Sequence, residues 1–322
     1  MTPAFDGPTT HAAPLLPTYQ GAVRLTQYGV LRVHGADAAT FLHGQLTQDF
    51  ALLGMQEARL AAFCNAKGRM QASFVGFKRQ PDDMLLIGSA DLLSQTLKRL
   101  RMFVLRAQAT LSDASSDWAV WGVVGDDIPA SLPAAPWQRM TQGDTTWIRL
   151  HPAAGMPRAL VCQPTQAPPP GSAALPADVW PWLEVHSAVA MVTQPLFEAL
   201  VPQMLNYESV GGVNFKKGCY PGQEVVARSQ FRGTLKRRTY VAHSESASVA
   251  EASAGAELFH TADPAQPCGL VVQSAPIPGG VGVDLLVSIT TSAADGQALR
   301  LGHANGPELT LRNLPYALLN DI

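Results

Sequence analysis

The sequence predicts an α+β protein of two or three domains whose C-terminal part is all-β. A chain of 322 residues, 47% of them hydrophobic, is long for one core. Strand-like and helix-like segments alternate in the first third, whereas several short apolar runs separated by Gly and Pro follow Arg238. Runs of that length and spacing are typical of a small antiparallel barrel or sandwich.

The first third predicts a strand-turn-helix unit, a hairpin and a second helix. Residues 30–33 form a strand pattern, and Asp37 stands where an N-cap would begin a helix over 38–46. Two β-rich runs then flank a turn in which Gly68 suits a positive φ angle. The leucines between 92 and 100 share one helical side, and cations follow near the helix end, where the helix dipole favours them.

Composition argues against a protein that binds nucleic acid or membranes through overall charge. The net charge is −2 and charged residues make up 15% of the chain, so any anion binding is local. No Lys or Arg precedes Arg24, and no sustained apolar segment follows the N-terminus, so no signal or transit peptide is expected. No run approaches the ~18 apolar residues that cross a bilayer. We therefore expect a cytoplasmic protein.

Several common catalytic motifs are absent from the sequence. It contains no P-loop, H-E-x-x-H, G-x-S-x-G or strand-associated G-x-G-x-x-G. The four cysteines are scattered without a C-x-x-C pair, so reduced thiols are expected and no metal site is predicted. The sequence therefore gives no motif-based support for a nucleotide-hydrolysing enzyme or a zinc hydrolase.

The most unusual segment is KKGCYPGQE at 216–224. Cys219 lies in a sharp turn, and Pro221 is suited to the first position of a helix over 222–228. A helix N-terminus and adjacent lysines favour a thiolate, although Glu224 in the first turn offers a cap for the same helix end. Because a lone cysteine is often a small buried hydrophobe, local chemistry leaves both a functional thiol and a packing residue open.

Two further clusters suit ligand binding. Between 216 and 238 seven Lys or Arg residues stand against Glu224, which suits a phosphate, a carboxylate tail, an RNA backbone or simply a solvated face. In DVWPWLEVHS, Trp180 and Trp182 precede Glu184. Aromatic rings beside a carboxylate suit a flat heterocycle with an amino-amide edge, although such tryptophans are more often core residues.

The segments KKGCYPGQEVVAR and FRGTLKRR, with GADAATFLHGQLTQD, CNAKGRM and PQMLNYESVGGVNF, closely resemble the YgfZ family. This is a family of folate-binding proteins implicated in iron-sulfur cluster assembly and repair. The resemblance is strongest at 202–238. The family is similar in fold to the T-protein, the aminomethyltransferase of the glycine cleavage system. The resemblance therefore implies a three-domain ring of α+β domains, with a C-terminal antiparallel β-barrel, around a tetrahydrofolate site.

Composition and this resemblance together predict four parts of the chain. They are a flexible leader at 1–20, a folate-binding α+β core from 21–112 and 176–235, a middle α+β domain at 113–175 that ends in a Pro-rich linker, and the C-terminal β-barrel at 236–322.

The resemblance also implies two groups of site residues. Cys219 matches the family's signature cysteine as a functional thiol, and the other expected catalytic residues of this motif are Lys217, Gln223, Glu224 and Arg228. The folate contacts fall on an aromatic residue before the first strand, here Tyr28, and on a tryptophan, here Trp180 or Trp182. Glu184 would meet the pterin edge, as the matching glutamate does in T-proteins.

By this resemblance the protein binds tetrahydrofolate or a one-carbon-substituted folate and supports iron-sulfur clusters in client enzymes. The clients are transient partners and include radical enzymes that methylthiolate tRNA, so tRNA is involved only indirectly. We expect a monomer with no membrane partner.

Two alternatives stay open. The first is a folate-dependent aminomethyltransferase, although the aspartate on which T-proteins rely falls in the register of Gln95 or Thr96 here. The resemblance thus leaves open whether the protein catalyses a reaction. The second alternative is a non-catalytic RNA- or protein-binding module with Cys219 buried.

Overall fold

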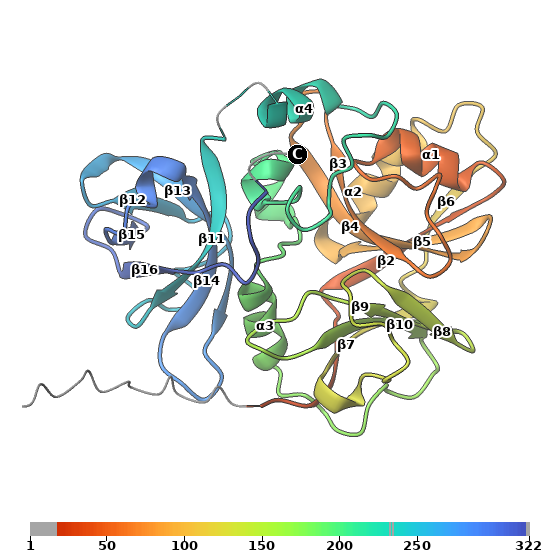
Figure 1. Cartoon of the computed structure of the whole chain (residues 1–322), viewed down its shortest axis with the longest axis horizontal. Helices are drawn as coiled ribbons and strands as arrows, with labels where there is room; N and C mark the ends of the chain where they lie inside the picture. Colours follow the sequence, from red (N-terminus) through yellow and green to blue (C-terminus); the bar gives the residue numbers. More distant parts are fainter. Residues whose placement is uncertain (1–17, 232, 234, 320–322) are drawn as a thin grey trace, which may run out of the picture.

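The computed structural model describes residues 18–231, 233 and 235–319. Two five-stranded sheets and one closed barrel surround a short central helix (Figure 1). The leader expected at 1–20 falls almost entirely outside the described residues. In the described part of the chain, no helix is both long and apolar enough to cross a membrane.

The first sheet is antiparallel and carries helices on one face. Its strands, in spatial order, are β3 (Ala58–Cys64), β4 (Met70–Gln80), β5 (Asp83–Ser89), β2 (Tyr28–His34) and β6 (Thr110–Asp113). The helices are α1 (Ala38–Gln45) and α2 (Ala90–Arg101). Leu31 and Val33 of β2 share a core with Leu93 of α2, whereas Val30 belongs to a core at the centre of the molecule. This alternation follows from the two-residue period of a strand, and it puts Tyr28 on the central face.

Local predictions in this region are confirmed, with two adjustments. Gly68 has a φ of +71° in the β3–β4 turn. Asp37 is the N-cap of α1, but its carboxylate accepts a hydrogen bond from the Gln108 N–H (2.7 Å) and caps no helix N–H. The helix ends at Gln45, one residue before the expected end.

The second sheet begins with the first strand of the chain. Its strands, in spatial order, are β1 (Gly21–Arg24), β7 (Trp118–Val124), β10 (Arg158–Pro164), β9 (Thr145–Arg149) and β8 (Arg139–Gln142). A short 3-10 helix, η1 (Gly125–Asp127), follows β7. Because β1 pairs with β7 in register Gly21↔Val124, residues 21–24 lie in the middle sheet, whereas the expected division assigned them to the first domain.

The C-terminal strands close into a barrel, so the barrel is confirmed over the sandwich. Its strands, in order around the barrel, are β11 (Arg237–Ser244), β14 (Val283–Thr290), β13 (Asp263–Pro276), β12 (Glu257–His260), β15 (Leu299–Leu301) and β16 (Glu308–Arg312). Pairing of β16 with β11 completes the closure. The remaining elements are α3 (Val179–Ser187), α4 (Gln223–Phe231), η2 (Gln194–Leu196), η3 (Pro202–Leu205) and η4 (Thr291–Ala293).

Helix α3 lies between the barrel and the two sheets (Figure 1). Residues four apart share a helix face, so Trp182 and His186 lie together and contact the barrel. There Trp182 Nε1 donates to Oδ2 of the buried Asp284 (2.8 Å), and His186 Nε2 lies 2.7 Å from the same oxygen. His243 Nδ1 lies 2.9 Å from Oδ1. A single carboxylate thus joins the helix to the barrel.

We expect this carboxylate to make stability fall at low pH. Burial alone would raise the pKa of Asp284, but hydrogen bonds from His186, His243 and Trp182 outweigh burial and lower the pKa to about 2. Since the usual carboxyl pKa is about 4, the ionised group stabilises the fold above that pH, and its contribution is lost as the pH falls through 2. Asp284→Asn should lower the free energy of unfolding by about 2 kcal/mol at pH 7, because the amide NH2 of the new side chain would face the hydrogen-bond donors that surround Asp284.

Urea unfolding at several pH values, followed by tryptophan fluorescence, measures this effect. Between about pH 4 and pH 2 the wild type should lose more stability than Asp284→Asn. Asp126→Asn, a change at an exposed carboxylate, is the matched control and should follow the wild type. Parallel curves for wild type and Asp284→Asn would contradict the assignment.

Candidate functional site

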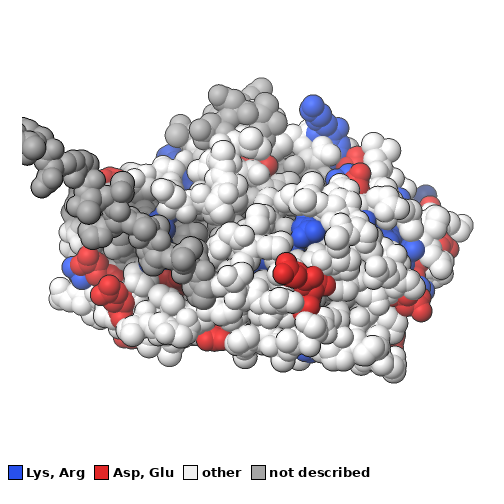
Figure 2. Space-filling model, turned by 60° about the horizontal axis from the view of Figure 1, so that its bottom comes forward, with Lys and Arg blue, Asp and Glu red and all other residues white. Residues whose placement is uncertain are grey.

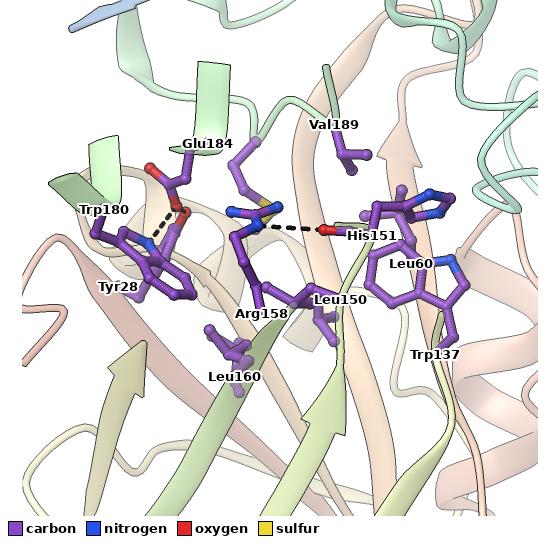
Figure 3. A pocket seen from close by; sticks show the side chains of 13 residues that line it. Tyr28, Leu60, Trp137, Leu150, His151, Arg158, Leu160, Trp180, Glu184 and Val189 are labelled. Atoms are coloured by element: carbon purple, nitrogen blue, oxygen red, sulfur yellow. Dashed lines mark hydrogen bonds between the residues drawn. The ribbon is translucent and has the colours of Figure 1, made fainter. Parts of the chain in front are cut away.

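The Glu184 carboxylate accepts hydrogen bonds from three parts of the fold, and Figure 3 shows it beside two of the donors, Tyr28 and Trp180. Oε1 accepts hydrogen bonds from the Tyr28 hydroxyl of β2 and from Trp180 Nε1, one helical turn earlier on α3 (2.9 Å). Oε2 accepts one from Gln273 Nε2 of the barrel strand β13 (3.0 Å). Burial and the neighbouring carboxylate raise the pKa of Tyr28 well above its usual value, so the phenol remains a donor at neutral pH.

Two hollow spaces meet at this carboxylate. A small cavity of about 40 Å³ is lined mainly by apolar side chains of the two sheets and by Trp180. A cleft of about 540 Å³ runs between the first sheet, α3 and the barrel. Tyr28, Glu184 and Met191 line both spaces. The cleft has the volume of a typical small-molecule site, and its polar groups converge on the junction.

The two tryptophans of α3 have different surroundings. Trp180 lines the small cavity, and its ring covers Gly122 of β7, where an added Cβ would lie 2.3 Å from the indole. Trp182 packs on His186 with ring centroids 4.3 Å apart and lines neither space. Of the four expected cofactor residues, the structure therefore brings Tyr28, Trp180 and Glu184 together and places Trp182 at the barrel interface. Both tryptophans are buried, as the core interpretation also expected.

Sequence reasoning missed Arg158, which opens the apolar strand β10. Its side chain is buried in the small cavity, with the guanidinium carbon 5.3 Å from the Trp180 ring centroid. Nε donates to the His151 carbonyl (3.2 Å). Burial lowers the pKa of Arg158 to about 10 against the opposing effect of Glu184, so it stays cationic at neutral pH. The one signal in the sequence was a cation at the start of the apolar run RALVCQ.

The KKGCYPGQE segment lies apart from these spaces. Lys217 is buried beneath it and donates from Nζ to the carbonyls of His43 (2.5 Å) and Leu46 (3.0 Å) at the end of α1. Burial lowers the pKa of Lys217 to about 8, opposed by Asp49 and Cys219. Lys217 therefore holds the segment against α1. Cys219 itself is exposed, so of the two interpretations left open by the sequence, a buried packing cysteine is wrong.

Two other segments that carry the resemblance to the YgfZ family, residues 35–49 and 64–70, contact this turn. A Cβ on Gly218 would lie 3.2 Å from His43 Nε2, and His43 Nδ1 lies 3.0 Å from Asp49 Oδ1. Gly222 lies directly against Gly68 of the β3–β4 turn. Segments distant in sequence are thus packed into one surface around Cys219, and His43 is a neighbour that the sequence analysis did not single out.

Helix α4 starts later than expected and directs its charges outward. Gly222 has a φ of +82°, so the helix begins at Gln223 and Pro221 does not occupy its first position. Glu224 and Arg228 pair with each other on the exposed face of α4. Gln223 is half-buried. None of these three residues lines the small cavity or the cleft.

The basic stretch 216–238 is not one continuous cationic face. Lys217 is buried, Arg228 is paired with Glu224, and Arg238 forms a buried ion pair with Glu208. Arg232 lies outside the described residues. Among the described residues, no group of three or more His, Cys, Asp or Glu side chains is arranged to hold a metal ion.

The arrangement of the two sheets and the barrel is a T-protein-like fold. The fold matches the crystal structure of the glycine cleavage system aminomethyltransferase T from Bartonella henselae with a TM-score of 0.68, over 94% of this chain and 87% of that one. Sequence identity is 13%, so this likeness concerns the fold alone. The predicted T-protein-like α+β fold with a C-terminal antiparallel barrel is confirmed. No protein-family model matches the chain.

Sequence comparison with known proteins narrows the resemblance to YgfZ proteins. A tRNA-modifying protein YgfZ from Edwardsiella ictaluri is 29% identical over 314 residues, which cover 92% of each chain. The YgfZ of Sodalis glossinidius is 27% identical over 310 residues, covering 92% of this chain and 93% of the relative. The resemblance to YgfZ seen in the sequence motifs is confirmed and extends over nearly the whole chain.

The surroundings of the four cysteines predict their order of reaction. Cys219 is exposed and Cys268 is half-buried, whereas Cys64 and Cys162 are buried, and burial raises the pKa of Cys162 to about 12. Thiolate exposure governs alkylation. Iodoacetamide at pH 8 should therefore modify Cys219 first, at least tenfold faster than the two buried thiols.

Mass spectrometry of peptides from timed, native-state samples measures the order, with urea-unfolded protein as the control in which all four react. Early modification of Cys64 or Cys162 in the native protein would contradict these surroundings.

Proposed function

We propose that this protein binds tetrahydrofolate and supports assembly or repair of iron-sulfur clusters in client enzymes, including radical enzymes that methylthiolate tRNA. Its similarity to proteins named for tRNA modification supports the involvement of tRNA. The observation that supports folate binding is the Glu184 carboxylate, which accepts hydrogen bonds from three donors where the small cavity meets the cleft. In this proposal the protein acts as a cytoplasmic monomer.

The residues at this junction fit a folate. A pterin ring presents neighbouring N–H donors, and a carboxylate accepts two such bonds. Glu184 Oε2 accepts one protein hydrogen bond, from Gln273, which leaves it a free lone pair. Tyr28 and Trp180 orient the carboxylate, and the cleft of about 540 Å³ has room for the rest of the ligand. When bound, tetrahydrofolate, free or one-carbon-substituted, supplies one-carbon chemistry.

We assign Cys219 to contact with the client. Its thiol is exposed on a turn that Lys217 and Gly222 hold against the first domain. A surface thiol is accessible to a protein partner as a reactive group or a transient ligand. Gln223, Glu224 and Arg228 follow on α4 and would form part of the same client surface. The thiol and the folate then act at separate places.

The aminomethyltransferase alternative has one observation in its favour and one against it. Asp91 of α2 lines the cleft with Tyr28 and Glu184. Its two oxygens already accept hydrogen bonds, from Ser89 Oγ (2.6 Å) and from the Gln194 N–H (2.9 Å), which is a structural role. In the register of the T-protein aspartate, Gln95 donates to Gln194 Oε1 (2.9 Å) and Thr96 is buried. Turnover with purified glycine cleavage partners would favour the alternative.

Direct RNA binding has weaker support. Lys and Arg side chains on the face in Figure 2 are scattered among acidic and uncharged residues, with no continuous cationic patch. Binding to a nucleic-acid backbone depends on several cations that contact phosphates together. We therefore propose that tRNA is reached through the client enzymes.

We expect Cys219→Ala to abolish function in cells while the fold persists. In a strain that lacks the gene, wild type should restore methylthiolation of tRNA, whereas Cys219→Ala at matched soluble levels should leave it near the deletion level. Cys268→Ala, at a half-buried barrel cysteine, is the matched control and should rescue. Equal rescue by Cys219→Ala would remove the thiol from the proposal.

The folate part is tested by titration of purified protein with tetrahydrofolate. Glu184→Gln replaces a charged acceptor by an amide, so the dissociation constant should rise about 10–100-fold, the equivalent of roughly 1.5–3 kcal/mol. Glu245→Gln, at an exposed barrel carboxylate, should bind as the wild type does. Unchanged affinity in Glu184→Gln would contradict the site.

A further inference from the structure

Arg158 has an unused donor inside the small cavity. Its side chain is 2% exposed, and Nη1 is buried without a hydrogen-bond partner among the described residues. A buried cationic N–H that lacks an acceptor costs free energy. Figure 3 shows Arg158 extending between Trp180 and Glu184 on one side and His151 on the other. One donor nitrogen of the guanidinium is therefore left without a partner beside the proposed ligand site.

The cavity sets this cation opposite one carboxylate. Arg158 and Glu184 are its charged lining residues, and none of the ion pairs found among the described residues joins the two. The rest of the lining is apolar or aromatic apart from His151, and burial, with the Arg158 charge, lowers the pKa of His151 to about 4. One acceptor and one donor across apolar walls suit the edge of a flat ring that binds in the adjoining cleft and carries both an N–H group and a carbonyl oxygen.

We propose that Arg158 is the specificity-determining residue of this site, donating to a ring carbonyl oxygen while the free lone pair of Glu184 Oε2 accepts from a neighbouring ring N–H. This inference rests on the proposed function and goes beyond it, since it states which ring the site selects. A carboxylate alone accepts hydrogen bonds from both a 2-amino-4-oxo ring and a 2,4-diamino ring. At position 4 the diamino ring presents an amino group in place of the carbonyl acceptor, so Arg158 selects the amino-oxo ring.

The chemistry of an amino-oxo edge is shared by pterins and guanine. Tyr28, Glu184 and Met191 line both the cleft and the cavity, so a ring bound against them in the cleft lies next to the space that Arg158 faces. The small cavity, at about 40 Å³, holds waters but no two-ring heterocycle. Guanosine is therefore the second probe, because it carries the same edge on a different scaffold.

The experiment compares wild type with Arg158→Met and Arg158→Lys. Tetrahydrofolate and tetrahydroaminopterin, which differ in the oxo or amino group at position 4, are titrated by calorimetry, with guanosine as a third ligand. Wild type should prefer tetrahydrofolate by about 10–100-fold, the effect of leaving a buried charged donor unpaired. Arg158→Met should lose this preference, and Arg158→Lys should keep part of it.

Thermal unfolding separates ligand recognition from a structural role. Arg158→Met removes a buried charge with an unsatisfied donor, so its melting temperature should match or exceed that of wild type. If Arg158→Met does not fold, the inference is judged on Arg158→Lys, whose preference should fall below that of wild type.

The outcomes are distinct for the two proposals. An unchanged preference in the Arg158 variants overturns this inference and leaves folate binding intact; Nη1 then serves only a water molecule. Binding of guanosine that depends on Arg158, without binding of either folate, supports the role of Arg158 and overturns the folate proposal. Failure of wild type to bind any of the three ligands overturns both.

Discussion

The arrangement of the molecule depends on the two faces of one nine-residue helix. In α3, Trp180 and Glu184 lie one turn apart and face the sheets, while Trp182 and His186 lie one turn apart and face the barrel. On each face a carboxylate makes hydrogen bonds to a neighbouring domain. Glu184 of α3 accepts them from Tyr28 of β2 and Gln273 of β13, and Asp284 of the barrel contacts Trp182 and His186 of α3. Because residues four apart share a helix face, a few residues of sequence fix how three domains meet.

Much of the fold could be predicted from local pattern, and the remainder depends on long-range pairing. Apolar alternation identified β2 and the β3–β4 hairpin, and leucine spacing identified α2. The partner of Gly21–Arg24 was not predictable, because four residues carry no information about pairing with β7 across about a hundred positions. Closure of the barrel likewise rests on β11 and β16, whose register no local signal sets.

The site could be predicted in part from the sequence, and the helical period carries further information about it. Tyr28, Trp180 and Glu184 came from the resemblance and from the chemistry of an aromatic-carboxylate pair. The spacing of four from Trp180 to Glu184 would also have separated Trp180 from Trp182. Arg158 could not be found, because its importance comes from the strand face and the cavity into which β10 places it. The start of α4 was predicted too early because the +82° φ of Gly222 breaks the helix there.

The donors on Glu184 have a thermodynamic consequence. Gln273 binds Oε2 from the barrel, at the carboxylate proposed to receive the ligand, whereas the barrel is also held by Asp284 on the opposite face of α3. Because a ligand would share this oxygen with Gln273, the occupied site would be linked through one carboxylate to the first sheet, to α3 and to the barrel. Occupancy of the site and packing of the barrel against the sheets would then stabilise each other.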